Sequence, residues 1–278
     1  MSIGVFVAVL GAAFLHASWN ALVKLGTSKL TSMLILTIVQ GAFGALIACT
    51  RPLPEGEVWW WLLASGALHA GYKLFLAFAY EHGDLSRVYP IARGAAPFLV
   101  LLASGLVLSD RIAPMEYAGI VSLGIGVLLM ARGVFSSGES RKLLPLALGS
   151  ALATAGYSIV DGLGARASGD AVTFVAWLFV FDAALFFPAS LMLGGAGVVR
   201  ANRQIWGLGS LAALLSYGAY AIVVWAMTVA PIALVTALRE TSILFGVLIG
   251  WLLFGEMMDR GKVMAAALIV GGVVLTRL

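Results

Sequence analysis

Ten apolar runs, each close to the length that a helix needs to cross a bilayer, follow one another along this chain with short connections. A bilayer core about 30 Å thick requires about 20 mostly apolar residues in a helix. Only 11% of the residues are charged, against about 25% in an ordinary soluble domain, so the chain cannot cover itself with polar surface in water. We predict an all-α, multi-pass membrane protein with ten transmembrane helices at 3–25, 30–50, 57–81, 85–109, 114–132, 143–165, 170–194, 203–229, 232–254 and 260–277.

Cysteine and histidine are too few to suggest a disulfide framework or a metal site. Cys49 is the single cysteine, and the three histidines have no paired spacing. The net charge of +4 comes from basic residues scattered singly at the ends of apolar runs, where they orient a membrane protein. We therefore expect no metal, no cofactor and no nucleic-acid partner. The expected partners are the lipid bilayer and a small-molecule substrate, and a monomer is compatible with the sequence.

The two halves of the chain carry polar residues at matching places. The longest polar stretch, 133–142, separates five spans from five. Residues 91–127 overlay residues 237–273 without a gap at an offset of 146, and an offset of 141 or 142 fits the earlier spans. The positions in register are Arg93 with Arg239, Asp110 with Glu256, Gly126 with Gly272, Asn20 with Asp161 and Gln40 with Asp182.

An odd number of spans in each half places the halves in opposite orientations in the membrane. We expect inverted repeats at 1–135 and 140–278 around a central cavity. This arrangement recurs in secondary transporters, because two equivalent halves can exchange conformations and give alternating access.

Three motifs connect the chain with a known family. They are "LHASWNALVK" in the first span, "RVYPIARGAAPF" at the fourth and "LFGE" at the end of the ninth. With ten spans in two halves, the chain resembles the EamA family of the drug/metabolite transporter superfamily, and within it the YddG-type amino acid exporters. The resemblance implies a basket-shaped helical fold that exports amino acids or related metabolites, with Tyr72, Tyr89 and Tyr157 lining the cavity.

The basic residues at the span ends predict the orientation. Ten lysines and arginines lie at the end shared by the 1–2, 3–4, 5–6, 7–8 and 9–10 connections, and four lie at the end with both termini. The positive-inside rule then places both termini outside the cytoplasm, whereas many members of the family keep basic termini inside. We expect the inner (plasma) membrane as the location.

Arg239 and Glu240 lie inside the ninth apolar run. Arg239 is seven residues past Ile232, or about 10 Å along the helix, so its side chain could still snorkel to the interface. Its in-register mate Arg93 favours a clamp for a carboxylate or a phosphate. Neighbours on a helix do not face each other, so Arg239 and Glu240 are each expected to need a separate partner.

Asp182 is the deepest acid, near the middle of its span. A carboxylate there must be protonated, paired with Lys or Arg, or exposed in a wet cavity. A carboxyl group that titrates on exposure could couple transport to protons. We assign proton or charge coupling to Asp182 and Glu240, and a structural hydrogen bond to a neighbouring helix is the alternative for Asp182.

Other polar and aromatic residues are spaced to share helix faces. Lys73 follows His69 by four residues, although Lys73 is also close enough to its helix end to snorkel; Asp161 follows Tyr157 by four. Tyrosine and tryptophan can contact both an apolar body and an ammonium group. The predicted substrate-binding residues are Trp19, Asn20, His69, Tyr72, Lys73, Tyr89, Arg93, Tyr157, Asp161, Tyr217, Tyr220 and Arg239.

Small residues and end carboxylates have structural roles in our interpretation. Ser122 and Gly126, with Ala118, and Gly271 with Ala267 repeat every four residues and permit close helix approach. Asp110 and Glu256 precede the fifth and tenth spans, where each would cap the helix that follows.

These features predict a secondary transporter of small metabolites, above all amino acids, that works by alternating access, and the resemblance implies that it exports them. A carrier of drugs, nucleotide sugars or phosphorylated metabolites is the alternative, since paired arginines also suit phosphate. The sequence has no HExxH, GxSxG, Asp-rich metal motif or phosphate loop, so an intramembrane enzyme is less expected. A scaffold would not need ionisable residues in so many spans.

Overall fold

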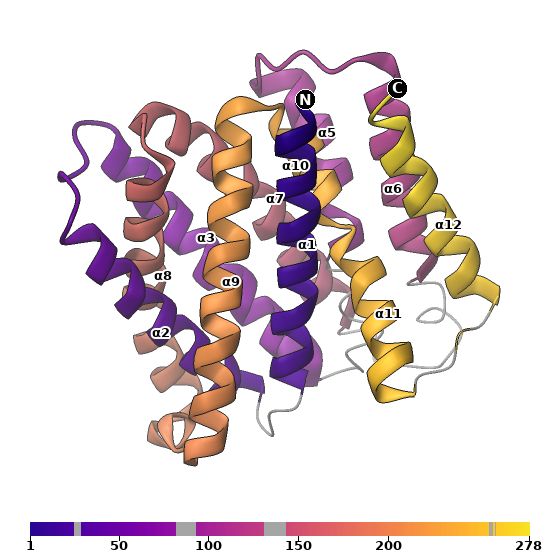
Figure 1. The fold of residues 1–278 in the computed structure, drawn as a ribbon. Helices are drawn as coiled ribbons and strands as arrows, with labels where there is room; N and C mark the ends of the chain where they lie inside the picture. The colour runs from indigo at the N-terminus through magenta and orange to yellow at the C-terminus, as the bar shows by residue number, and fades with distance from the viewer. Residues whose placement is uncertain (25–28, 82–92, 131–142, 256–257, 259) are drawn as a thin grey trace.

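The computed structural model describes residues 1–24, 29–81, 93–130, 143–255, 258 and 260–278. These residues are almost entirely helical (Figure 1), and seven of their helical spans are long and apolar enough to cross a membrane. The elements are α1 (Ile3–Lys24), α2 (Lys29–Ala48), α3 (Val58–Glu81), α5 (Ala96–Val107), α6 (Pro114–Met130), α7 (Leu143–Ser168), α8 (Ala171–Gly194), the 3-10 helix η2 (Ala196–Val199), α9 (Arg203–Val229), α10 (Ile232–Arg239), α11 (Ser242–Phe254) and α12 (Arg260–Leu275).

Helices occupy all ten predicted segments, but the ninth is broken in its middle. α10 ends at Arg239 and α11 begins at Ser242. Across the break the backbone N–H groups of Glu240 and Thr241 bond three residues back, at 3.0 and 3.1 Å, which is the tighter 3-10 pattern. The Thr241 hydroxyl also donates to the Leu238 carbonyl at 2.7 Å, so it satisfies one of the carbonyls that a helix end leaves open. The prediction of one continuous helix over 232–254 is therefore wrong.

The fourth span has a break at the matching position. Arg93 and Gly94 are helical, Ala95 is a bend, and α5 begins at Ala96. The offset of 146 carries Ala95 onto Thr241, the residue that precedes α11. Both halves of the chain thus interrupt a helix just after the in-register arginine.

Helix packing relates the two halves of the chain. α3 packs on α7 and α1 on α9, while α2 packs on α8 and α6 on α12 (Figure 1). These pairings are unchanged when each helix is exchanged for its counterpart five spans away. Both termini lie at one end, where Arg277 donates to the Met1 carbonyl at 2.8 Å.

The contact between α6 and α12 shows the same equivalence of the two halves in its individual atoms. A Cβ on Gly126 would lie 2.9 Å from the Ala265 carbonyl oxygen, and one on Gly272 would lie 2.8 Å from the Gly119 carbonyl oxygen. The offset of 146 converts the first pair into the second. The Ser122 hydroxyl donates to the Leu268 carbonyl at 2.9 Å. Close approach therefore depends on Gly119 and Gly272, and not on Ala118 and Gly271 as predicted.

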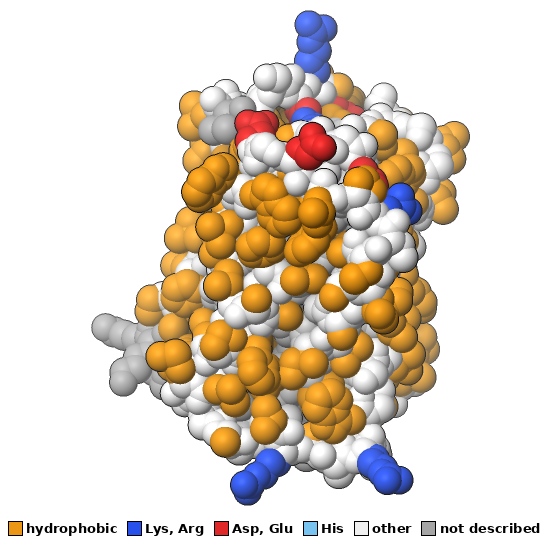
Figure 2. All heavy atoms as spheres, turned by 90° about the vertical axis from the view of Figure 1, so that its left-hand side faces the viewer, with side chains coloured by type: hydrophobic (Ala, Val, Ile, Leu, Met, Phe, Trp, Pro, Cys, Tyr) orange, Lys and Arg blue, Asp and Glu red, His pale blue; other side chains and the backbone are white. Residues whose placement is uncertain are grey.

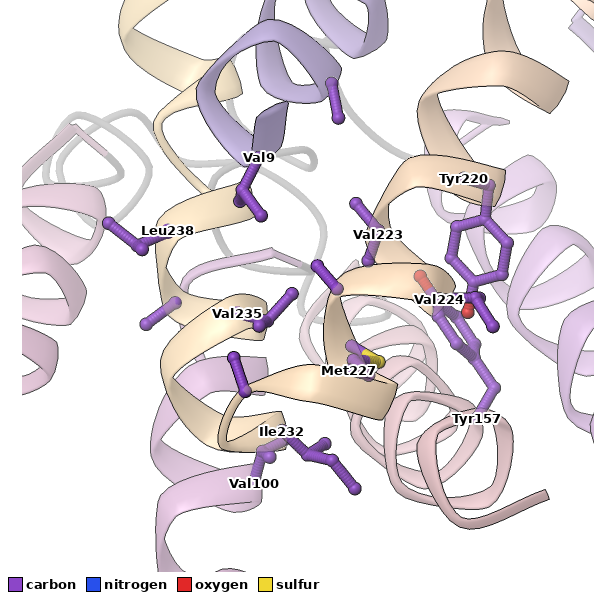
Figure 3. Packing of buried hydrophobic residues seen from close by; sticks show 14 of the residues in the cluster. Val9, Val100, Tyr157, Tyr220, Val223, Val224, Met227, Ile232, Val235 and Leu238 are labelled. Atoms are coloured by element: carbon purple, nitrogen blue, oxygen red, sulfur yellow. The ribbon is translucent and has the colours of Figure 1, made fainter. Parts of the chain in front are cut away.

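On the face that Figure 2 shows, apolar side chains cover the middle of the surface, and charged side chains lie at its two ends. Inside the bundle, a cluster of buried apolar residues joins α1, α5, α7, α9 and α10 (Figure 3). An apolar exterior of this kind matches a hydrocarbon environment, so the polar groups of interest are those inside.

Adding one methyl group at Gly272 tests the α6–α12 contact. Gly272→Ala forces that group against backbone and Leu123 and should destabilise the protein by about 1–3 kcal/mol. Gly271→Ala is a matched control, because nothing lies within 4 Å of its added Cβ. Thermal unfolding in detergent measures both. Equal melting temperatures for the two variants would contradict the close contact.

Candidate substrate site

Charged side chains meet in the interior of the bundle. Among the described residues, three cations and three acids have at most 6% of their surface exposed, so the formal charges of this group balance. The cations are Lys73, Arg93 and Arg239, and the acids are Asp161, Asp182 and Glu240. Buried ions persist only when they are paired and hydrogen-bonded, and each of the six lies in a polar cluster.

The first cluster pairs Lys73 of α3 with Asp182 of α8. The ammonium group contacts the Asp182 carboxylate and donates to the Thr37 hydroxyl of α2 at 2.7 Å. It also lies 5.4 Å from the centre of the Phe186 ring. Lys73 is only 2% exposed, so the alternative in which its side chain snorkels to the interface is wrong.

The second cluster is built on Asp161 of α7. His69 Nε2 lies 2.9 Å from Asp161 Oδ2, and the Tyr220 hydroxyl of α9 donates to the same oxygen. The Tyr157 ring stacks on His69 with centroids 4.1 Å apart. This cluster therefore fixes a carboxylate with an imidazole and a phenol, between helices from both halves.

The third cluster joins Arg93 and Glu240 in a two-pronged ion pair. Arg93 Nε and Nη2 donate to the two Glu240 oxygens at 3.0 and 2.9 Å. Arg239 Nη2 lies 3.5 Å from Glu240 Oε1 and 3.5 Å from the Ser158 hydroxyl, and its guanidinium faces the Tyr157 ring at 5.6 Å. Arg239 is 1% exposed, so it does not snorkel. The expectation of separate partners for Arg239 and Glu240 agrees with these contacts, because Glu240 pairs with Arg93 whereas Arg239 faces Ser158 and Tyr157. The two neighbours also approach one another, at 3.5 Å.

Helix ends explain why these two charges are placed side by side. Arg239 is the last residue of α10, where the helix dipole is negative, and Glu240 precedes α11, whose N-terminus is positive. Discontinuous helices with such ends form the sites of many transporters. The first half has Gly94 at the matching position, where an added Cβ would lie close to the side chains of Val127 and Leu128, at 3.0 and 3.2 Å.

A cavity lies beside Arg93. Its volume is about 10 Å³, about what one water molecule needs, so this conformation is closed around its centre. Trp19 Nε1 donates to His16 Nδ1 at 3.2 Å. Because Nδ1 accepts this bond, His16 Nε2 is the nitrogen of the neutral ring that carries a proton and can donate it. The lining residues are His16, Trp19, Asn20, Tyr72, Leu76, Arg93, Ser150 and Thr154.

Several buried polar atoms in this region have no hydrogen-bond partner among the described residues. They include one oxygen each of Asp161 and Asp182, the Tyr217 hydroxyl, His16 Nε2 and Arg239 Nε. An unsatisfied buried group costs about 1–3 kcal/mol, so these atoms are candidate contacts for water or a polar substrate.

The sequence interpretation and the structure agree on where most site residues lie, although their roles stay predictions. Tyr217 differs from the other predicted tyrosines: it packs against the Phe43 and Phe179 rings at 4.9 and 5.0 Å. Tyr89 lies outside the described residues. The sequence interpretation missed the hydroxyls of Ser150, Thr154 and Ser158. Their spacing of four residues along α7, continuing to Asp161, was the signal that could have found them.

A double-mutant cycle tests the Lys73–Asp182 pair. Lys73→Met and Asp182→Leu each leave an uncompensated buried charge and should cost about 3–5 kcal/mol, whereas the double variant should recover most of this loss. Unfolding in detergent gives the three free energies. Additive losses in the double variant would show that the two side chains do not stabilise one another.

Comparison with known proteins gives the context for this geometry. The model of the EamA-like transporter family matches residues 2–132 and again 141–278. The chain is 27% identical over 273 residues to the pseudopaline exporter CntI of Pseudomonas aeruginosa strains UCBPP-PA14 and PAO1, covering 96% of this chain and 93% of the relative. A solved crystal structure has the same fold, with a TM-score of 0.76 and 18% sequence identity; the match covers 99% of this chain and 96% of that chain.

The double match spans nearly the whole chain, and the all-helical fold fits it. This chain is a multi-pass membrane protein of the EamA-like transporter family, within the drug/metabolite transporter superfamily, and it is not an enzyme.

Proposed function

We propose that this transporter exports small metabolites that carry a carboxylate, amino acids foremost, by alternating access across the inner membrane. The observation that carries the proposal is the Arg93–Glu240 ion pair beside the central cavity. A substrate carboxylate can take the same two donors of Arg93, since a guanidinium binds carboxylates through a planar fork. The pseudopaline exporter among the relatives supports the direction of transport.

In this proposal Glu240 is an internal competitor of the substrate. Both Glu240 oxygens are held by Arg93, so a substrate carboxylate can bind only when Glu240 leaves. A displaced carboxyl in a desolvated site is neutralised by a proton, which would couple one proton to each binding event. Arg239 lies 3.5 Å from Glu240 and favours its charged form, so proton uptake requires Glu240 to move away from both arginines.

The ammonium group of an amino acid needs an anionic partner as well. Asp161 and Asp182 each have one oxygen without a partner among the described residues. Tyr72, which lines the cavity beside Arg93, offers an aromatic ring to the substrate body. Because the buried cations and acids balance, a zwitterion adds no net charge to the site.

The repeats and the orientation are part of the proposal. The halves 1–135 and 140–278 would act as inverted repeats that rock about the α2–α8 and α6–α12 contacts. The ten-to-four excess of basic residues supports an orientation with both termini outside the cytoplasm.

Flux into liposomes tests the substrate class. Purified protein should exchange labelled amino acids across the membrane, and an imposed pH gradient should accelerate the flux. The panel should include sugar phosphates and pseudopaline, because a substrate like that of the relative is the second candidate. Transport of sugar phosphates without transport of any amino acid would reject the proposed substrate class.

Two variants should move substrate affinity in opposite directions. Glu240→Gln removes the carboxylate that competes with the substrate for Arg93. The amino acid that the flux assay identifies should therefore bind more tightly, and a pH gradient should no longer accelerate its transport. Arg93→Gln combined with Glu240→Gln removes the clamp and should weaken binding about 10–100-fold.

Glu116→Gln is the matched control for these variants. Glu116 Oε2 accepts the Ala113 backbone N–H at the exposed start of α6, and glutamine can keep such a cap. Its binding and flux should equal those of the wild type. If Glu240→Gln bound substrate no better than the wild type and kept its pH response, Glu240 would not be the competitor.

A further inference from the structure

Arg166, at the end of α7, forms an ion pair with Asp110, which follows α5. Arg166 Nη1 and Nη2 donate to the two Asp110 oxygens at 2.8 and 3.1 Å. The pair lies at the end of the bundle that carries both termini, as the α7, α9 and α10 ends show in Figure 1. The side chains are 30% and 14% exposed, so water reaches them, in contrast to the buried pairs of the central site.

The same two side chains also bind the backbone of neighbouring helix ends. Arg166 donates to the carbonyls of Met227 at 2.8 Å and Ala230 at 3.0 Å, at the end of α9. Asp110 Oδ2 accepts the Ile232 backbone N–H at 2.8 Å, at the start of α10. Asp110 therefore does not cap α6 as predicted: it caps α10, a helix more than a hundred residues away, and Glu116 caps α6.

The Asp110–Arg166 pair joins the two halves of the chain at the end that carries both termini. Asp110 belongs to the first half, and the other groups that it binds belong to the second. In alternating access the halves separate at one end while they close at the other. Opening at the end with the termini must therefore break the bonds of Asp110 to Arg166 and to Ile232, whereas the bonds of Arg166 to Met227 and Ala230 lie within the second half and can remain.

Along three helices, the Asp110–Arg166 pair lies between the central site and the end of the bundle that carries the termini. Arg166 and Asp161 are five residues apart on α7, Met227 and Tyr220 seven residues apart on α9, and Ile232 and Arg239 seven residues apart on α10. These separations correspond to about 7–10 Å of helix. The polar site thus begins roughly two helical turns inside the pair.

Apolar side chains fill the space between them. Val100, Met227, Ile232 and Val235 belong to one buried cluster and point toward one another (Figure 3). The Ile232 side chain packs so close to α7 that a Cβ on Gly162 would lie 2.5 Å from it. An apolar layer of this kind blocks water and charged solutes as long as the helix ends hold it closed.

We propose that Asp110 and Arg166 form the gate that closes the transport pathway at the end carrying both termini. Their contacts pull α7, α9 and α10 onto the segment after α5 and so keep the apolar layer closed. Partial exposure suits this role, because water can solvate the two charges when the gate opens. The inference goes beyond the proposed function, resting only on alternating access and not on any substrate.

Access of a water-soluble thiol reagent to the apolar layer tests the gate. Cys49 is the single cysteine and is exposed, so Cys49→Ser gives a background without thiols. Val235→Cys then places a thiol of nearly the same size between the gate and the site. A membrane-impermeant maleimide is added to the end that carries the termini, in proteoliposomes of known orientation.

Labelling of this cysteine should be slow with the native gate. Arg166→Ala and Asp110→Ala should each accelerate it at least about tenfold, because a loss of about 1.4 kcal/mol from the closed state shifts the equilibrium tenfold. Arg166→Lys keeps the charge but loses the fork and should lie between. Arg51→Ala is the matched control: it removes a cation at the same end, whose 3.5 Å pair with Asp170 is exposed, and should leave the rate unchanged.

A conservative variant covers the case in which a gate variant fails to fold. Asp110→Asn, in the Cys49→Ser and Val235→Cys background, keeps the size of the side chain and an oxygen that can accept the Ile232 N–H but removes the charge that pairs with Arg166. Its reporter cysteine should label faster than with the native gate. Unchanged labelling in Arg166→Ala, Asp110→Ala and Asp110→Asn would overturn the gate. None of these results requires a transported substrate, so the gate and the substrate proposal fail separately.

Discussion

A carboxylate inside a bilayer is stable only when cations and hydrogen-bond donors surround it, and the position of Glu240 reflects this requirement. Arg93 holds both of its oxygens, Arg239 approaches one of them, and the start of α11 lies behind it. To bring these groups together, the ninth span must break and the two halves must pack against each other. The break, the packing of α5 and α10, and the closed cavity all follow from that one contact.

Tyr157 connects this ion pair with the rest of the interior. Its ring stacks on His69, which contacts Asp161, and it also faces the Arg239 guanidinium. A movement of α7 that displaced Tyr157 would disturb both clusters at once. The second and third clusters are therefore coupled through Tyr157, whereas Lys73 contacts Asp182, Thr37 and Phe186. In contrast, water reaches the Asp110–Arg166 pair. Separating these two charges therefore costs less free energy than separating a buried pair, because water can solvate each of them.

Helix positions followed from the sequence, because length and apolarity together decide which segments cross a membrane. α9 begins and ends at the predicted residues 203 and 229. The break after Arg239 escaped prediction, since neither glycine nor proline lies there and the interruption depends on tertiary contacts of its charges. Likewise, nothing near Lys73 in the sequence reveals its partner Asp182, which is 109 residues away. Asp110 was misassigned for the same reason: its helix partner is 122 residues away.

The sequence alone determined the membrane class, the ten spans, the register of the two halves and the presence of Arg93 and Arg239 at matching positions. Only the tertiary structure decided that both arginines turn toward the same acid. Glu240 has no acidic counterpart in the first half, where Gly94 occupies the matching position and packs closely against the side chains of Val127 and Leu128. Hydropathy and periodicity report how each helix meets its surroundings, whereas the pairing of charges 147 residues apart depends on which helices finally lie side by side.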